Sequence, residues 1–313
     1  MKATYGLVPY TGIWSNAVYV DHTGPMTNNV EDNALMLEVI AGADGYDPRQ
    51  YNVKTQRYTE ALKGKDGLKG MKIAVVKEGY LQEGDLRASD WGHLRRNLNA
   101  EKEASEKVKA ATAALKSLGA TVEEVSIPMH PVAPAIAAPI LVQGGDGAYE
   151  GSAYGRSNSD LYVTSLMDFH RNWRSRANEL SETTKLLTMF GTYIRNYYGS
   201  RYYGKAMNLT RMLTAAYDKV LDSYDLLAMP TTVVKSQPIP APDASREEYV
   251  QRGFEMLANT QGFDITHHPA MAIPCGMSDG LPVSLQLVGK HFNESTIYKA
   301  AHGFQEGTDW KNM

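Results

Sequence analysis

The sequence predicts an α/β fold with a mixed, largely buried sheet that is covered by helices on both faces. Short apolar runs rich in β-branched residues occur at 72–76 and 121–127, and a single apolar stripe at helical spacing lies between them. This strand, helix, strand order is typical of a βαβ unit with parallel strands. Further strand-like runs alternate with helical segments toward the C-terminus, which favours one α/β domain over residues 1–313.

Each expected element has its own local signal in the sequence. Apolar residues from Val30 to Ala41 fall on one face of a first helix, with Asn29 as its N-cap and Gly42 at its end. The segment from about 161 to 224 has few glycines and many helix formers, so we expect a mostly helical insertion there. The remaining expected elements are a crossover helix at 101–118, strands at 225–229, 270–273 and 284–288, and a last helix at 293–304.

Composition limits the classes of function. A net charge of -3 over 313 residues gives no basic excess, so we expect no nucleic acid partner. The first residues do not form the apolar run of a signal peptide, and no stretch reaches the roughly 18 apolar residues of a membrane span. The single cysteine, Cys275, fits a reducing compartment. These observations predict a soluble, cytoplasmic protein with no membrane association.

The usual catalytic and cofactor motifs are not found. The sequence has no Gly-x-Ser-x-Gly elbow, zinc-binding His-Glu-x-x-His helix, Walker loop or Rossmann glycine fingerprint. The adjacent pair His267 and His268 would point to different faces and has no neighbouring carboxylate or cysteine cluster, so we expect neither a metal nor a cofactor. Cys275 follows an apolar strand without an obvious base, which indicates a buried structural thiol instead of a nucleophile.

Two further segments allow both a functional and a structural interpretation. Gly144-Gly145-Asp146-Gly147 is expected to form a flexible turn, which either brings backbone amides close to a ligand or simply connects two elements. The tyrosine-rich stretch 193–203 would either line an apolar pocket or pack in the core.

Five segments, in the right order, resemble the amidase-signature family. They are 5–12 (Tyr-Gly-Leu-Val-Pro-Tyr-Thr-Gly), 21–27 (Asp-His-Thr-Gly-Pro-Met-Thr), 41–49 (ending Asp-Pro-Arg), 224–231 and 273–289. The resemblance covers nearly the whole chain. Within the family, the sequences of these segments are similar to the C-terminal two-thirds of amidases found alongside nitrile hydratases. It implies an acylamide amidohydrolase that, when complete, releases ammonia and a carboxylic acid from small aliphatic or aromatic amides.

The same resemblance implies that the catalytic residues lie outside this chain. Family members use a nucleophilic serine, a second serine and a lysine base, all upstream of the segment that begins here at Tyr5. No residue of this chain matches them, so we expect the C-terminal portion of a single domain, inactive alone. A truncated gene, a fragment and one part of a split enzyme remain open. Two further alternatives are a noncatalytic or partner-dependent subunit, and a protein like the amidotransferase subunits that act on misacylated tRNA.

The resemblance also implies a set of pocket-lining or supporting residues. They are Asp21 beside Gly-Pro, the turn residues Gly144, Gly145 and Asp146, and Thr266 with His267 before a late strand. His267 stands where the family often has a close-packed glycine. The expected partners are a small amide substrate and a missing N-terminal segment or complementary chain, and a homodimer is left open.

Overall fold

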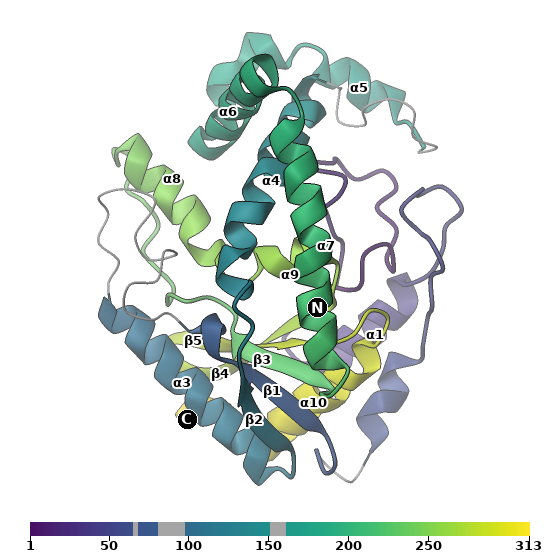
Figure 1. Cartoon of the computed structure of the whole chain (residues 1–313), viewed down its shortest axis with the longest axis vertical. Helices are drawn as coiled ribbons and strands as arrows, with labels where there is room; N and C mark the ends of the chain where they lie inside the picture. The colour runs from purple at the N-terminus through teal and green to yellow at the C-terminus, as the bar shows by residue number, and fades with distance from the viewer. Residues whose placement is uncertain (65–67, 81–97, 151–160) are drawn as a thin grey trace.

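A computed structural model of the chain describes residues 1–64, 68–80, 98–150 and 161–313. Its centre is a five-stranded sheet in the order β2-β1-β3-β5-β4 (Figure 1). Strands β2, β1 and β3 are parallel, whereas β5 runs antiparallel to both β3 and β4. The bounds are β1 Lys72–Val76, β2 Thr121–Val125, β3 Leu226–Pro230, β4 Ala270–Ser278 and β5 Leu281–Val288. The predicted mixed sheet is confirmed.

Helices cover both faces of this sheet, as predicted. Alternate residues of β1 point to opposite faces: Ile73 joins the hydrophobic core under α1, α3 and α10, whereas Ala74 joins the core under α4, α7 and α9. The helices are α1 Val30–Ile40, α3 Leu98–Ser117, α4 Ala133–Glu150, α5 Thr164–His170, α6 Glu182–Tyr198, α7 Arg201–Leu221, α8 Arg246–Phe254, α9 Gln261–Thr266 and α10 Glu294–Gly307. Figure 1 shows α3 and α7 on opposite sides of the strands.

Local signals set several of these bounds. The Asn29 side chain accepts a hydrogen bond from the Asp32 amide at 2.7 Å, which confirms the predicted N-cap of α1. Helices α5, α6 and α7 occupy most of the segment predicted to be helical. Its place as an insertion in a single larger domain stays a prediction.

The two C-terminal strands are longer than predicted and form a hairpin. Asp279 and Gly280 join them in a two-residue turn with φ of 50° and 76°, the arrangement of a type I′ turn. The sequence analysis ended the first strand at Ile273, before Pro274. Proline is tolerated there because β4 is an edge strand, and a register shift follows between Pro274 and Gly276.

The segment expected as a glycine-rich turn is helical, which corrects that prediction. Gly144, Gly145, Asp146 and Gly147 belong to α4, which also contains Pro139. Apolar residues at helical spacing, including Ile136 and Ile140, pack into the core against the sheet and hold the helix despite these breakers. The amides of this segment are therefore part of a helix and not of an open ligand-binding turn.

The first residues of the chain are joined to the C-terminal third. Lys2 forms an antiparallel bridge with Ala270 at the edge of β4, with N–O distances of 2.8 and 2.9 Å. The carboxylate of Glu294, at the start of α10, accepts hydrogen bonds from the amide and hydroxyl of Thr4 at 2.8 and 2.6 Å. Glu294 is fully buried, so these bonds replace its water.

Candidate functional site

Residues 15–22 form a compact loop, called here the site loop, and Asp21 organises it. One carboxylate oxygen of Asp21 accepts hydrogen bonds from the Ser15 hydroxyl at 2.9 Å and from the amides of Asn16 and Ala17 at 2.7 and 3.0 Å. The Ala17 carbonyl in turn accepts from the amides of Val20 and Asp21. Burial raises the pKa of Asp21, and the three hydrogen bonds oppose that rise. Asp21 therefore fixes the path of the loop backbone.

Helix α4 presses against the site loop through glycine. A Cβ added at Gly144 would lie 2.6 Å from the Cβ of Ala17, closer than two carbon atoms can approach. At Gly145 the nearest atom to an added Cβ is the Asn16 side-chain oxygen, at 3.6 Å, which is an ordinary contact. The glycine at position 144 is thus needed for close approach, whereas the sequence interpretation assigned it a turn.

His267 contacts the site loop from the other side. Its Nε2 donates to the Tyr19 carbonyl at 2.8 Å, and its ring stacks on Tyr5 with centroids 4.0 Å apart and planes at 7°. Burial lowers the pKa of His267 to about 4, so the imidazole is neutral near pH 7. Its φ of 68° is left-handed, a conformation that favours glycine.

An arginine clamp holds the neighbouring turn. Arg49 donates two hydrogen bonds to the carboxylate of Asp47, at 2.8 and 2.7 Å, and its guanidinium lies 4.3 Å from the centre of the Tyr10 ring. Asp47 also accepts from the Tyr10 amide at 2.8 Å. A further bond from Arg49 reaches the Asp21 carbonyl at 3.4 Å. This clamp joins the Asp-Pro-Arg segment to the site loop.

Two charged residues near the site loop were missed by the sequence interpretation. Burial lowers the pKa of Lys2 to about 8 and raises the pKa of Asp264 to about 6. The Lys2 ammonium lies 3.4 Å from Nε2 of His22, whose own pKa burial lowers well below its usual value. The available signal for Asp264 was its place between the apolar residues Phe263 and Ile265, both of which are buried.

The predicted site residues divide into three groups. Asp21, Gly144, Gly145 and His267 meet at the site loop, although they come from three distant parts of the chain. Thr266 is buried beside it, where its hydroxyl donates to the Gly262 carbonyl at 2.8 Å and lies 2.9 Å from Nδ1 of His268. The Asp146 side chain lies outside the described residues.

Neither Ser15 nor Cys275 is placed as a free nucleophile. Ser15 donates to Asp21, as described above. Cys275 is fully buried and free, and burial raises the pKa of its thiol to about 12, which confirms the predicted structural thiol. The site loop and its neighbours therefore supply shape, aromatic surface and neutral imidazole.

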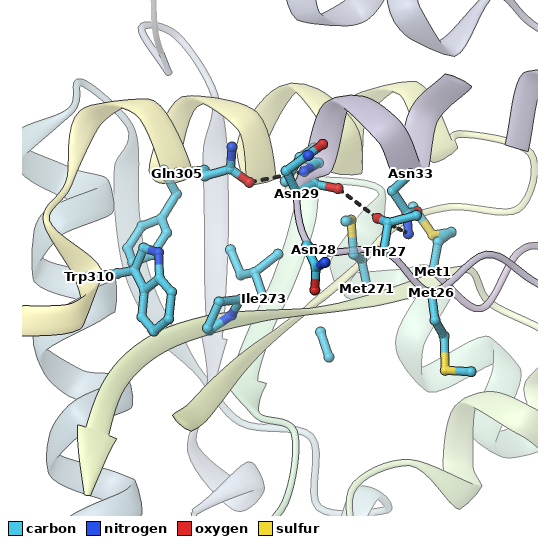
Figure 2. Close-up of a pocket in the computed structure, with 14 residues that line it drawn as sticks. Met1, Met26, Thr27, Asn28, Asn29, Asn33, Met271, Ile273, Gln305 and Trp310 are labelled. Carbon is cyan, nitrogen blue, oxygen red and sulfur yellow. Dashed lines mark hydrogen bonds between the residues drawn. The ribbon is translucent and has the colours of Figure 1, made fainter. Parts of the chain in front are cut away.

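A separate pocket of about 220 Å³ opens along the outer edge of β4 (Figure 2). Apolar side chains such as Met26, Ile273 and Trp310 line much of it. Two of its side-chain amides are already used in the fold, because Gln305 accepts from the Val30 amide at 2.9 Å and Asn33 donates to the Pro25 carbonyl at 3.1 Å. The pocket therefore has the character of an uncovered sheet edge.

In the described part of the chain, no helix combines the length and apolarity needed to span a bilayer.

Comparisons with known proteins agree with this architecture. Residues 1–298 match the family described as Amidase. A glutamyl-tRNA(Gln) amidotransferase subunit of Lysinibacillus sphaericus is 37% identical, over 99% of this chain and 59% of its own length. An enantioselective amidase of Rhodococcus rhodochrous is 36% identical, over 96% of this chain and 55% of its own length. The crystal structure of the corresponding amidotransferase subunit from Thermotoga maritima superposes with a TM-score of 0.69 at 26% identity, covering 98% of this chain and 57% of that one.

The chain thus spans somewhat more than half the length of these relatives. The family match extends over nearly the whole chain, and the fold agrees with that of a solved relative. This chain belongs to the amidase-signature family.

Proposed function

We propose that this chain forms the scaffold and one wall of the substrate pocket of an acylamide amidohydrolase. In the complete enzyme, ammonia would be released from small aliphatic or aromatic amides, and a carboxylic acid would remain. The nucleophilic serine, the second serine and the lysine would come from residues that this sequence does not contain. The chain taken alone would therefore be inactive, and it would act in the cytoplasm.

One observation carries this proposal. Asp21, Gly144 and His267 come from segments more than 100 residues apart, and all three act on the backbone of the site loop. A loop fixed from several directions is what a pocket wall needs, because the reacting groups must be held to within a fraction of an ångström. The stack of the Tyr5 ring on the His267 ring adds a rigid aromatic support to this wall.

A second candidate is a protein like the matching subunit of a tRNA-dependent amidotransferase. It is favoured by the 37% identity to the Lysinibacillus sphaericus protein, whose name marks it as one subunit of a larger enzyme. The 36% identity to the Rhodococcus rhodochrous amidase is nearly equal, so overall identity does not separate the two. The sequence Tyr10-Thr11-Gly12 favours the acylamide amidohydrolase, since the amidotransferase subunits usually carry a Ser-Arg type of sequence there.

The test compares this chain alone with a hybrid that places the upstream portion of the Rhodococcus rhodochrous amidase before Met1. We expect ammonia release from benzamide or propionamide by the hybrid, and neither turnover nor labelling by a serine-directed covalent probe in the chain alone. Turnover by the chain alone would overturn the assignment of the catalytic residues to another segment. A folded hybrid that hydrolyses glutamine but neither amide would favour the amidotransferase candidate, and a folded, inactive hybrid would favour a noncatalytic subunit.

A further inference from the structure

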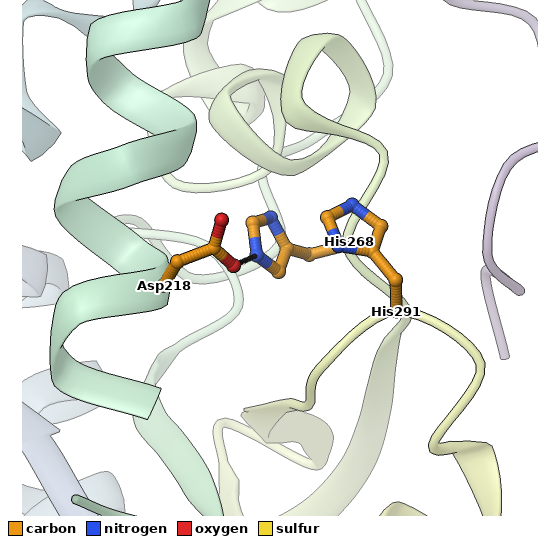
Figure 3. A group of neighbouring side chains, drawn as sticks. All are labelled: Asp218, His268 and His291. Carbon is orange, nitrogen blue, oxygen red and sulfur yellow. Dashed lines mark hydrogen bonds and ion pairs between the residues drawn. The ribbon is translucent and has the colours of Figure 1, made fainter. Parts of the chain in front are cut away.

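Three side chains from distant segments bring together the ligand types of a metal centre. They are Asp218 of α7, His268 between α9 and β4, and His291 after β5 (Figure 3). One potential ligand atom from each residue lies within 4.8 Å of the other two. Two imidazoles and one carboxylate are a common ligand set for Zn²⁺ and related divalent ions.

The hydrogen bonds of Thr266 set which ring nitrogens are available. His291 Nε2 lies 2.9 Å from the Thr266 carbonyl, and a carbonyl only accepts, so Nε2 carries the hydrogen and Nδ1 keeps its lone pair. The Thr266 hydroxyl donates to the Gly262 carbonyl at 2.8 Å, so it accepts from Nδ1 of His268 at 2.9 Å. The lone pair of a neutral His268 is then on Nε2.

In this tautomer two acceptors face each other, whereas with the hydrogen on Nε2 His268 donates to Asp218. His268 Nε2 and a carboxylate oxygen of Asp218 are 3.1 Å apart, and the His268 side chain is fully buried. Two lone pairs at this distance repel unless a cation or a proton lies between them. Ligands held 2.0–2.2 Å from a tetrahedral ion lie roughly 3.3–3.6 Å apart, so this pair is already close to the spacing that zinc requires.

We propose that Asp218, His268 and His291 bind one divalent transition-metal ion, with Zn²⁺ as the best-matched ion. Metal-bound histidines usually donate their second nitrogen to a carbonyl or another acceptor, and Thr266 provides that acceptor for both imidazoles. About half of the Asp218 side chain is exposed, 48%, which gives an ion a route from solvent. The ion would draw His291 toward the other two ligands and join α7, β4 and the segment after β5.

The position of this site suggests what the ion would do. His268 is adjacent to His267, which holds the Tyr19 carbonyl of the site loop. Fixing His268 and Thr266 would therefore restrict the backbone that presents His267. The role is structural support of the pocket wall, and it does not depend on the amide chemistry proposed above.

The test measures Zn²⁺ binding to the full 313-residue chain after treatment with a chelator and dialysis. Titration calorimetry should give one equivalent per chain, and zinc should raise the melting temperature. Asp218→Asn and His291→Gln should each weaken binding by more than the ~10–100-fold that loss of an outer hydrogen-bond partner causes. Both positions are partly exposed, so these variants are expected to fold.

His302→Gln is the matched control, since His302 lies in α10 outside the cluster, and it should bind zinc like the original chain. Two results would overturn the proposal. One is the absence of zinc binding by the original chain at micromolar concentrations. The other is binding that survives unchanged in both Asp218→Asn and His291→Gln, which would leave His268 and Asp218 as a simple hydrogen-bonded pair.

Discussion

The contact between α4 and the site loop makes a quantitative prediction at Gly144. In Gly144→Ala the new methyl group would lie 2.6 Å from the Cβ of Ala17, about 1 Å closer than the optimum for two carbon atoms. Relieving such overpacking costs about 1–3 kcal/mol. Replacing glycine by alanine inside a helix returns about 0.5–1 kcal/mol. The expected net loss in free energy of unfolding is about 0–2.5 kcal/mol.

Gly145→Ala is the matched control for this prediction. It receives the same helix-propensity gain, but its new methyl group meets only the Asn16 side-chain oxygen at 3.6 Å. The difference between the two variants therefore isolates the contact with Ala17 and should be about 1–3 kcal/mol. Urea denaturation followed by circular dichroism measures both. Equal stability of the two variants would show that the loop gives way and that Gly144 is not needed for close approach.

Three other substitutions test the site residues. His267→Gly should be more stable than His267→Ala by about 1 kcal/mol, because only glycine accepts a φ of 68° without strain; equal melting of the two would contradict this. Asp21→Asn should cost about 1–3 kcal/mol, since an amide oxygen accepts the three hydrogen bonds more weakly than a carboxylate oxygen does, whereas Asp243→Asn at an exposed position should be nearly neutral in the same assay. Burial raises the pKa of Asp264 to about 6 from 3.8, so between these pH values the folded chain keeps a proton that the unfolded chain has released. Asp264 should therefore contribute a fall in the free energy of unfolding of on the order of 2–3 kcal/mol as pH rises from about 4 to 6, and this contribution should be missing from Asp264→Asn; parallel pH profiles of the two proteins would refute it.

The elements that the sequence predicted well are those specified by neighbouring residues. The run 72–76 needs no distant information to be identified as a strand, and Asn29 caps α1 through a residue three positions away. The hairpin at Asp279-Gly280 had an equally local turn signal in its Asp-Gly pair, which the sequence analysis did not use. The end of helix α4 at 144–147 was mispredicted for a different reason. Its glycine at 144 is explained only by the close contact with Ala17, which the local sequence does not reveal.

The same distinction applies to the candidate site. Asp21 bonds to residues four to six positions away, so its role as a backbone acceptor followed from the local sequence. The stack of Tyr5 on His267 joins residues at opposite ends of the chain, and no spacing rule indicates it. The grouping of Asp218 with His268 and His291 also depends on three elements whose relative placement only the fold supplies.

The bonds between Thr4 and Glu294 have a consequence for how the chain folds during synthesis. These partners are 290 residues apart, and Lys2 likewise pairs with Ala270, which is synthesised much later. At about 5–20 residues per second, a ribosome needs on the order of 15–60 s to make that intervening stretch. Throughout that interval the first residues have no native partner at the sheet edge. Their docking should therefore be a late, slow step, and it is the step at which a nascent chain would be most open to a chaperone or to mispairing with another copy.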